Sequence, residues 1–361
     1  MKLLQVSDLH LSAKNDRSYC FGVLSGIIEL AESKQCEKIL FAGDVFDSYP
    51  DLESLRSEFI SHCTKFSGTI YYLPGNHEIL YRKSKNYSYT ELDWSPKIKM
   101  LDSIPFSLEN LGEVELVSIP HQENYADLLL NPPSPKTHLP RLGLAHGTVS
   151  GMSFTGLDEE EEEGGSYIDP KHIQSLQLDY LAVGHLHKKR ESLIGNCNVQ
   201  YAGSSRVWRR GELGPRYAIY IEVNGKNIKT EPLPIVQAGQ YHQLAITLGI
   251  DGKPTEPIDL ELEKYSPYDW VSIRFEGYVE SMEEKRKLIS QVTSVWGKKF
   301  RILDFDEDET GIRVIENLGD NEFIKQFLDK MNQKQSEMDP SIWKLTRNLG
   351  LQMIVEANKK R

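Results

Sequence analysis

Short apolar runs that end in polar, glycine-containing motifs recur through the N-terminal half of the chain. Lys2–Val6 predicts a first strand, apolar enough to lie in the middle of a sheet. Asp16–Cys36 carries apolar residues at helical spacing, and Lys38–Ala42, Leu52–Phe66 and Thr69–Leu73 repeat the alternation as strand, helix and strand. This β-α-β-α-β pattern predicts an α/β fold whose site lies along the carboxyl edge of one sheet.

Further strands are expected at 98–101, 114–119, 142–145, 180–183, 199–201, 217–222 and 228–232. The polar and aromatic segment 81–96 predicts a long loop or lid, and residues 132–140 form a proline-rich connection. The first domain is therefore expected to comprise residues 1–235.

The rest of the chain predicts a smaller module and two terminal helices. Strands at Trp270–Phe275 and Phe300–Leu303 with a helix at Ser281–Val295 indicate an α+β domain at 236–315. Amphipathic helices at Asn321–Met331 and Pro340–Ala357 form a terminal segment at 316–361. Their apolar stripes either pack on their own domain or dock a partner.

Composition and charge narrow the function classes. The 361 residues are 39% hydrophobic and 26% charged, as in an ordinary globular protein. A net charge of −11 does not by itself suggest a nucleic-acid binder, although part of it is the run at 158–163, expected to be a solvated loop. Basic residues around Trp208 and at Lys188–Arg190 are still compatible with a local basic surface that binds DNA. Without CxxC pairs, a signal peptide or a long apolar run, the chain is expected in the cytoplasm and off the membrane.

The chemistry gathers in the polar motifs at the expected strand ends. The candidates are Asp8, His10, Asp44, Asn76, His77, His146, His185 and His187. Carboxylate, amide oxygen and imidazole without thiolate suit manganese, iron, zinc or nickel. This set is too large for one tetrahedral ion, but it suits two ions that share a carboxylate and clamp a phosphoryl group during hydrolysis. No GxxxxGK[ST] or GxGxxG motif indicates a nucleotide site of those kinds.

In this order, the motifs D-x-H, G-D-x-x-D, G-N-H-E, H-G and G-H-x-H resemble those of the calcineurin-like metallophosphoesterase superfamily. Within it, SDLHLS, FAGDVFD, YLPGNHE and YLAVGHLH, followed by YAGSSRVW, are similar to the SbcD-type DNA double-strand-break repair nucleases. The resemblance implies an α/β fold: a four-layer β-sandwich flanked by helices, then a small α+β capping, DNA-binding domain and C-terminal helices.

The resemblance also implies a role for each residue. Asp8, His10 and His187 would hold one metal, Asn76, His146 and His185 the other, and Asp44 would bridge them. His77 would act on the phosphate in the transition state. Asp47, which stands where some relatives have a second histidine, is expected either near the substrate or as a structural carboxylate. Ser204, Ser205 and Arg206 are expected to contact the nucleic-acid backbone.

The function that follows is a DNA exonuclease and endonuclease with two divalent ions, most simply Mn²⁺, acting in break repair or end processing. A homodimer, nucleoid-associated when on DNA, would work with an SMC-like ATPase of the SbcC type docked on the terminal helices. The alternative is a stand-alone phosphodiesterase or phosphatase on nucleotides or other phosphoesters, which the acidic net charge favours. A non-catalytic binding module is disfavoured, since every expected ligand position is filled.

Overall fold

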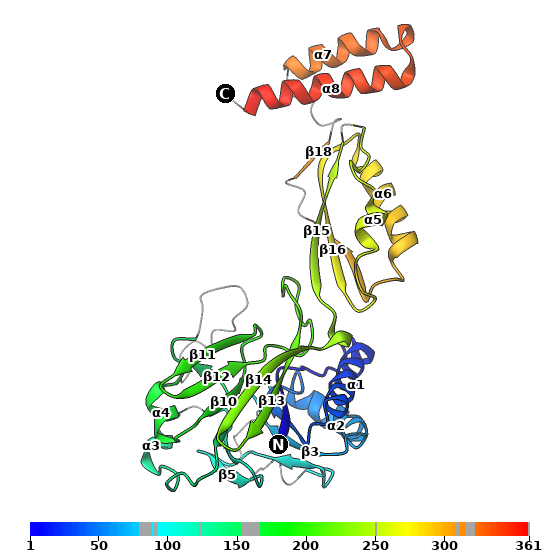
Figure 1. Cartoon of the computed structure of the whole chain (residues 1–361). Helices are drawn as coiled ribbons and strands as arrows, with labels where there is room; N and C mark the ends of the chain where they lie inside the picture. The colour runs from blue at the N-terminus through cyan, green and yellow to red at the C-terminus, as the bar shows by residue number, and fades with distance from the viewer. Residues whose placement is uncertain are drawn as a thin grey trace. The chain divides into compact units, whose positions relative to one another are not determined.

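The computed structural model describes residues 1–361 except 79–88, 90, 91, 123, 153–166, 250, 308–310, 315–321, 360 and 361 (Figure 1). Most of the expected loop at 81–96 and all of the acidic run at 158–163 lie outside the described residues. The chain forms two compact units, Met1–Gln240 and Tyr241–Arg361. No described helix is long and apolar enough to cross a membrane.

The first sheet of unit 1 has six strands in the order β14-β13-β1-β2-β3-β4. Their bounds are β1 Lys2–Val6, β2 Lys38–Ala42, β3 Thr69–Leu73, β4 Ile98–Met100, β13 Tyr217–Asn224 and β14 Asn227–Pro234. The strands β1 to β4 are parallel, whereas β13 runs antiparallel to β1. Helices α1 (Arg17–Ser33) and α2 (Tyr49–Cys63) pack their apolar faces on this sheet. The central place of β1 explains its apolar sequence.

The second sheet of unit 1 also has six strands, in the order β11-β12-β10-β7-β6-β5. Their bounds are β5 Ser107–Asn110, β6 Glu115–Ile119, β7 Arg141–His146, β10 Tyr180–Gly184, β11 Arg190–Ile194 and β12 Cys197–Tyr201. The four inner strands are parallel. The short helices α3 (Asp127–Leu130) and α4 (Pro170–Ser175) and the two-stranded pair β8 (Thr148–Val149) and β9 (Tyr167–Ile168) complete unit 1.

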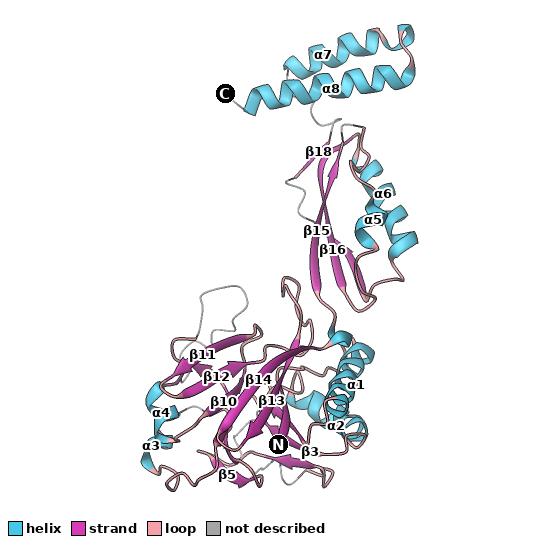
Figure 2. Ribbon diagram, viewed as in Figure 1, coloured by secondary structure: helices cyan, strands magenta, loops and turns pink. Residues whose placement is uncertain are grey.

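Apolar side chains of the two sheets pack against each other in the middle of unit 1. Leu40 and Leu73 of the first sheet share one buried cluster with Leu144 and Ala182 of the second. With the helices outside, this gives a four-layer α/β sandwich (Figure 2), so the expected fold class is confirmed. The expectation of one continuous sheet, drawn from the strand pattern alone, is wrong. A buried parallel strand has the same apolar sequence in either sheet, so the pattern cannot count sheets.

Several boundaries differ from the expectation for physical reasons. Helix α2 begins earlier because Ser48 caps it, accepting a hydrogen bond from the Asp51 amide at 3.3 Å, and Pro50 occupies the first turn. The edge strands β5 and β11 were not expected, since their alternation is largely polar and half-exposed. Edge strands carry fewer apolar residues, and so give a weaker sequence signal.

Unit 2 contains a sheet in the order β15-β16-β17 with β18 also paired to β16, all parallel. The strands are β15 Tyr241–Leu248, β16 Trp270–Val279, β17 Ile302–Phe305 and β18 Ile312–Val314, and the helices α5 Ile258–Leu262 and α6 Met282–Trp296. Of these, β15, β18 and α5 were not expected. Helices α7 (Glu322–Gln333) and α8 (Pro340–Lys359) form a hairpin with a small core that includes Ile324 and Leu351, and Tyr278 of β16 packs against it.

Candidate metal centre

The candidate ligands follow the carboxyl ends of strands from both sheets: β1, β2 and β3 from the first, and β7 and β10 from the second. Asp8, His10, Asp44 and His185 all have left-handed backbones, with φ of 51°, 47°, 49° and 105°. Asp8 and His10 therefore reach the site from left-handed turns and not from an extended strand. Non-glycine residues in this region are strained, and such strain concentrates at functional sites.

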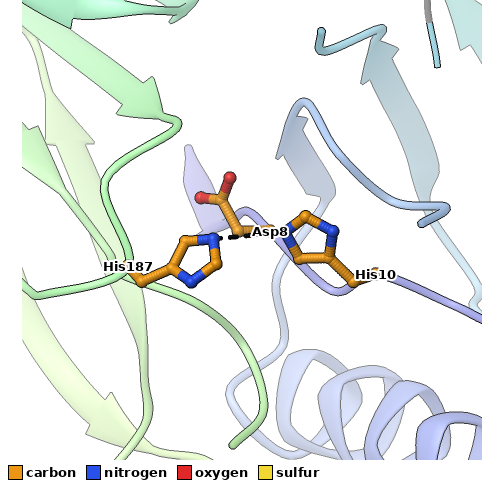
Figure 3. A group of neighbouring side chains, drawn as sticks. All are labelled: Asp8, His10 and His187. Carbon is orange, nitrogen blue, oxygen red and sulfur yellow. Dashed lines mark hydrogen bonds between the residues drawn. The ribbon is translucent and has the colours of Figure 1, made fainter. Parts of the chain in front are cut away.

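One group of ligand atoms consists of Asp8, His10 and His187 (Figure 3), with the ligand atoms within 4.8 Å of one another. Nε2 of His10 lies 3.2 Å from Nε2 of His187. The Asp8 carboxylate is fully buried and accepts hydrogen bonds from the backbone amide of His185, at 3.0 and 3.1 Å. Residues far apart in the sequence thus converge at one point between the sheets.

The second group consists of Asn76, His146 and His185. Oδ1 of Asn76 lies 2.8 Å from Nε2 of His146 and 3.1 Å from Nδ1 of His185. Asp44 lies between the two groups: one oxygen is 3.2 Å from Nε2 of His146, and its carboxylate also falls within 4.8 Å of ligand atoms of His10 and His77. This is the position that a bridging carboxylate requires.

The protonation equilibria of these groups favour a cation. Burial lowers the pKa of His10 to about 4 and that of His185 to about 3, which leaves both imidazoles neutral at pH 7. Burial would also lower the pKa of His146, but the carboxylates of Asp44 and Asp8 outweigh it and raise the pKa to about 9. The pKa of Asp44 is lowered, because His146 and its other imidazole neighbours outweigh the effect of burial. Positive charge therefore stabilises the buried carboxylates at this point, and bound divalent ions would provide that charge.

Three of the histidines bind a protein oxygen or face one through Nδ1, the ring nitrogen that points away from the site, as metal-binding histidines commonly do. Nδ1 of His146 donates to the carbonyl of Ala42 at 2.7 Å, and Nδ1 of His187 donates to Glu212 at 2.9 Å. Nδ1 of His10 faces a carboxylate oxygen of Asp47 at 3.4 Å. Each of these contacts leaves Nε2 as the atom that points into the site. The opposed Nε2 atoms of His10 and His187 would be two facing acceptors without a cation, so the residues fit two metal ions.

His77 stands beside these groups. Its ring lies 4.8 Å from that of His10 in an edge-on arrangement, and its Nδ1 donates to the carbonyl of Asp47 at 3.0 Å. Asp47 contributes through its carbonyl to His77 and through its carboxylate to His10, which fits the structural alternative of the sequence expectation.

Ser204, Ser205 and Arg206 are placed differently from what was expected of substrate contacts. All three are buried. Ser205 donates to the carbonyl of Ser7 at 2.7 Å, and Ser204 to that of Arg206 at 2.9 Å. The Arg206 guanidinium donates to the carbonyls of Leu9 and His10, both at 2.7 Å. Ser205 and Arg206 thus hold the loop that carries Asp8 and His10, whereas Ser204 bonds within its own segment. The hydrogen bonds of all three face the interior instead of a substrate.

Three further residues belong to the site and were not singled out from the sequence. Glu212 contacts His187, and the Trp208 indole stacks on the His10 ring at 4.2 Å. Glu78 is fully buried and accepts hydrogen bonds from the amides of Phe46 at 2.7 Å and Gly75 at 3.0 Å. Glu78 could have been found from its place in GNHE and Trp208 from its place at the end of YAGSSRVW, whereas Glu212 follows that motif in a loop whose sequence signal was its positive charge.

A sequence model of the calcineurin-like phosphoesterases matches residues 1–189, which include every candidate ligand. The chain belongs to this family. Members hydrolyse phosphoesters with two divalent metal ions, in agreement with the paired ligand groups around Asp44.

Solved structures similar to this chain include three of low sequence identity. A dimetal phosphatase from Danio rerio is 8% identical and covers 65% of this chain and 96% of its own, with a TM-score of 0.42. A purple acid phosphatase from yellow lupin is 10% identical over 67% of this chain and 52% of its own, with a TM-score of 0.47. A Thermus thermophilus protein is 13% identical over 64% and 98%, with a TM-score of 0.42. No curated protein sequence matches the chain.

In this phosphoesterase the bound ions would activate water and neutralise phosphate charge. The chain's own residues do the rest. The two groups around Asp44 would hold the ions, and the Asp8 carboxylate is positioned by hydrogen bonds from the His185 amide. His77 is oriented by the Asp47 carbonyl and lies beside the ring of His10.

Proposed function

We propose that this phosphoesterase is an SbcD-type, Mn²⁺-dependent DNA exonuclease and endonuclease that acts in double-strand-break repair or end processing as a homodimer with an SMC-like ATPase. The observation that carries the proposal is that the SbcD-like segment YAGSSRVW is built into the metal centre. Arg206 of this segment holds the backbone of His10, and Trp208 stacks on its ring. The SbcD-like motif therefore contacts a candidate metal ligand directly.

Local charge supports a nucleic-acid backbone as substrate despite the acidic total. Lys188 and Lys189 are exposed and, with His187, line a cavity of about 250 Å³. Arg209 and Arg210 are exposed on the segment that contacts the ligands. Cations at the mouth of a phosphoesterase site attract a polyanion locally, because charges beyond about 10 Å are screened at ordinary salt.

Unit 2 offers features suited to DNA. Val271, Ile273 and Phe275 of β16 pack into the core, so the alternate residues lie on the other face of the sheet. On that face, Arg301 lies over the ring of Trp270 at 5.5 Å, and Arg313 over Tyr278 at 5.8 Å. Arginine paired with aromatic rings is typical of surfaces that bind nucleic-acid strands.

An exposed apolar stripe on helix α8 supports the proposal of a protein partner. Ile342, Leu345, Leu349 and Met353 are 52–66% exposed and recur at helical spacing. The opposite side of the helix already packs on α7 through Leu351 and Trp343. A second apolar stripe on a paired helix is the form that docking on a coiled coil takes.

The deciding experiment is hydrolysis of labelled linear duplex DNA beside a bis-aryl phosphodiester, with added Mn²⁺ and with His77→Ala as control. We expect both substrates to be cleaved and the variant to lose about 10²–10⁴-fold in rate while it keeps its metal. Cleavage of the small ester alone, also when the ATPase is added, would favour the stand-alone phosphodiesterase. Loss of metal from the variant would place His77 among the ligands.

The partner is tested separately with Leu345→Asp/Leu349→Asp, both on the exposed stripe of α8. We expect this variant to lose co-purification with the co-expressed SMC-like ATPase and to keep hydrolysis of the small ester. A matched control, Lys344→Asp, changes charge on the same helix outside the stripe. Retained binding in the double variant would contradict docking on α8.

The homodimer is tested independently by measuring the mass of the protein in solution with light scattering.

A further inference from the structure

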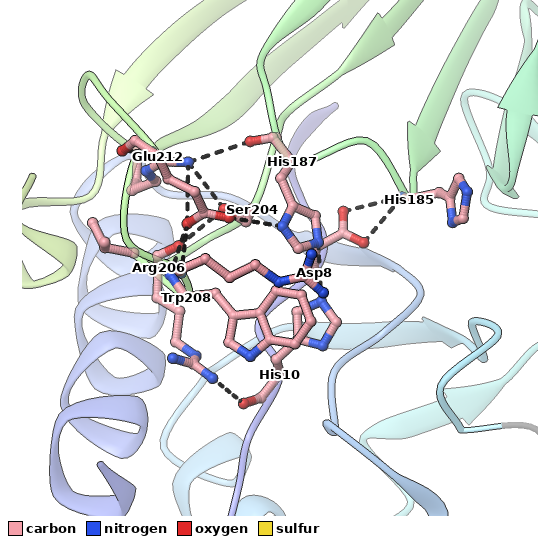
Figure 4. A network of polar contacts seen from close by, with 12 residues as sticks. Asp8, His10, His185, His187, Ser204, Arg206, Trp208 and Glu212 are labelled. Carbon is pink, nitrogen blue, oxygen red and sulfur yellow. Dashed lines mark hydrogen bonds and ion pairs between the residues drawn. The ribbon is translucent and has the colours of Figure 1, made fainter. Parts of the chain in front are cut away.

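A single segment between β12 and β13 contacts both imidazoles of one metal position. It runs from Arg206 to Arg216 and includes Trp208 and Glu212 (Figure 4). Arg216 is buried and donates to the His187 carbonyl at 3.3 Å and to Ser204 Oγ at 3.0 Å. The segment is thus anchored at both ends next to the Asp8–His10–His187 group.

Glu212 joins His187 to this segment. Its carboxylate accepts hydrogen bonds from His187 Nδ1 at 2.9 Å, the Trp208 amide at 2.8 Å and the Arg209 amide at 3.2 Å. A buried carboxylate that accepts a hydrogen bond from Nδ1 fixes the tautomer and the ring plane of His187, so that Nε2 faces the site.

Trp208 acts on the other imidazole. Its indole lies parallel to the His10 ring, with a centroid distance of 4.2 Å and an interplanar angle of 4°. It also meets the edge of His187 at 5.0 Å. Arg206 donates to the His10 carbonyl, and Trp208 stacks on the His10 ring. His10, whose backbone is left-handed, is therefore held at both its backbone and its ring. Figure 4 shows Trp208 beside His10, with Glu212 reaching His187 from the same segment.

The second metal position is held by different means. His146 is the last residue of β7, and its Nδ1 donates to the backbone of β2. A Cβ on Gly43 would lie 2.1 Å from Nδ1 of that ring, so backbone presses directly against His146. Its orientation therefore comes from the sandwich itself.

We propose that the segment 206–216 is a positioning element for the Asp8–His10–His187 position alone, in which Glu212 orients His187 and Trp208 immobilises His10. The affinity of this position for a divalent cation is then set separately from that of the Asn76–His146–His185 position. The inference rests on the two-metal site of the proposed function. It names Glu212 and Trp208 as positioning residues, since neither needs to touch metal or substrate.

The test is calorimetric Mn²⁺ titration of the metal-free full chain, with Mn²⁺ electron paramagnetic resonance to distinguish single ions from coupled pairs. We expect the wild-type protein to take up two ions. Glu212→Gln should weaken one of them about 10- to 100-fold, with loss of the coupled-pair signal at limiting Mn²⁺. Trp208→Leu should weaken the same ion, and Trp208→Phe, which keeps an aromatic ring over His10, should restore part of the loss.

Two reference variants assign the affected ion. His187→Ala removes a ligand of the proposed position, so adding Glu212→Gln to it should cause no further weakening. Asn76→Ala removes a ligand of the other position, so adding Glu212→Gln there should weaken the ion that remains. Glu115→Gln, which breaks the ion pair of Glu115 with Arg141 at 2.8 Å, is the matched control and should leave both ions unchanged.

Equal weakening of both ions, or none, in Glu212→Gln and in Trp208→Leu would overturn the positioning role. Further weakening on top of His187→Ala would also overturn it. Uptake of only one ion by the wild-type protein would instead overturn the two-metal site itself. The two failures are thus distinguished before any activity is measured.

Discussion

At the scale of single residues, the site depends on side chains whose polar atoms are already committed. The guanidinium of Arg206 is buried and bonded to the Leu9 and His10 carbonyls, and Glu78 is buried among the amides of Phe46 and Gly75. Such residues hold the strained ligand loops, and their loss leaves buried polar groups without partners.

Arg206→Met should therefore destabilise the protein by about 2–4 kcal/mol, because two buried carbonyls lose charged donors. It should also weaken metal binding through His10, with little change in KM for DNA once metal is saturating. Urea unfolding of the metal-free protein and Mn²⁺ titration check this. Unchanged stability with a raised KM would instead restore the original expectation that Arg206 contacts substrate.

Glu78 predicts a pH dependence of stability in the metal-free protein. Burial, helped by the nearby Asp44 carboxylate, raises the pKa of Glu78 from 4.5 to about 7. The folded state then keeps a proton that the unfolded chain releases, so this group's contribution is present below pH 4.5 and is lost as the pH rises through 7. The free energy of unfolding, measured from pH 4 to 8, should fall more steeply for wild type than for Glu78→Gln. Parallel curves would contradict it.

At the scale of elements, glycines let the strand ends approach one another. A Cβ on Gly75 would lie 2.0 Å from Oδ1 of Asp44, and one on Gly184 would lie 1.9 Å from the Ala42 carbonyl. The loop after β3 and the end of β10 therefore come closer to β2 than any side chain would allow. Gly184 lets the end of β10 in the second sheet reach the Ala42 carbonyl of β2 in the first, because a glycine brings only its backbone to the contact.

Gly75→Ala should displace the Asp44 carboxylate, weaken both metal positions and destabilise the fold by about 1–3 kcal/mol. The matched control is Gly22→Ala in α1, where a Cβ meets no described atom within 4 Å outside the helix. It should stabilise the protein by about 0.4–1 kcal/mol and leave metal binding intact. Calorimetric titration and thermal unfolding of both variants check this; normal Mn²⁺ affinity in Gly75→Ala would contradict the close approach.

At the scale of the whole molecule, metal chemistry and the proposed partner surfaces lie in different units. Every candidate ligand and the clusters around both sheets belong to Met1–Gln240. The arginine–aromatic pairs and α8 belong to Tyr241–Arg361, which has cores of its own. Each unit thus buries enough apolar surface to be a folding unit.

A chain ending at Gln240 should fold, bind two Mn²⁺ ions and hydrolyse the small diester at a rate close to that of the full chain. On duplex DNA it should lose at least about tenfold in rate, because the arginine–aromatic pairs of unit 2 are gone. Circular dichroism, metal titration and the two hydrolysis assays check this. Full activity on DNA would show that unit 2 does not contact it.

The sequence by itself determined most of the inner strands and helices of unit 1 and the inventory of candidate ligands. Apolar strands such as Lys2–Val6 and the polar motifs that follow them are local patterns, so they could be recognised without the fold. The metal ligands follow because a strand end in a parallel sheet must expose its next residues at one edge.

Only the tertiary structure decided how these pieces meet. Two facing sheets, rather than one, bring β1 and β10 together, and left-handed backbones rather than extended ones aim Asp8 and His10. Arg206, Trp208 and Glu212 contact the candidate ligands His10 and His187. The sequence could not show this, because the residue type does not reveal whether an arginine or a glutamate is buried. Which partner a charged side chain meets depends on contacts between residues nearly two hundred positions apart, and no local pattern carries that information.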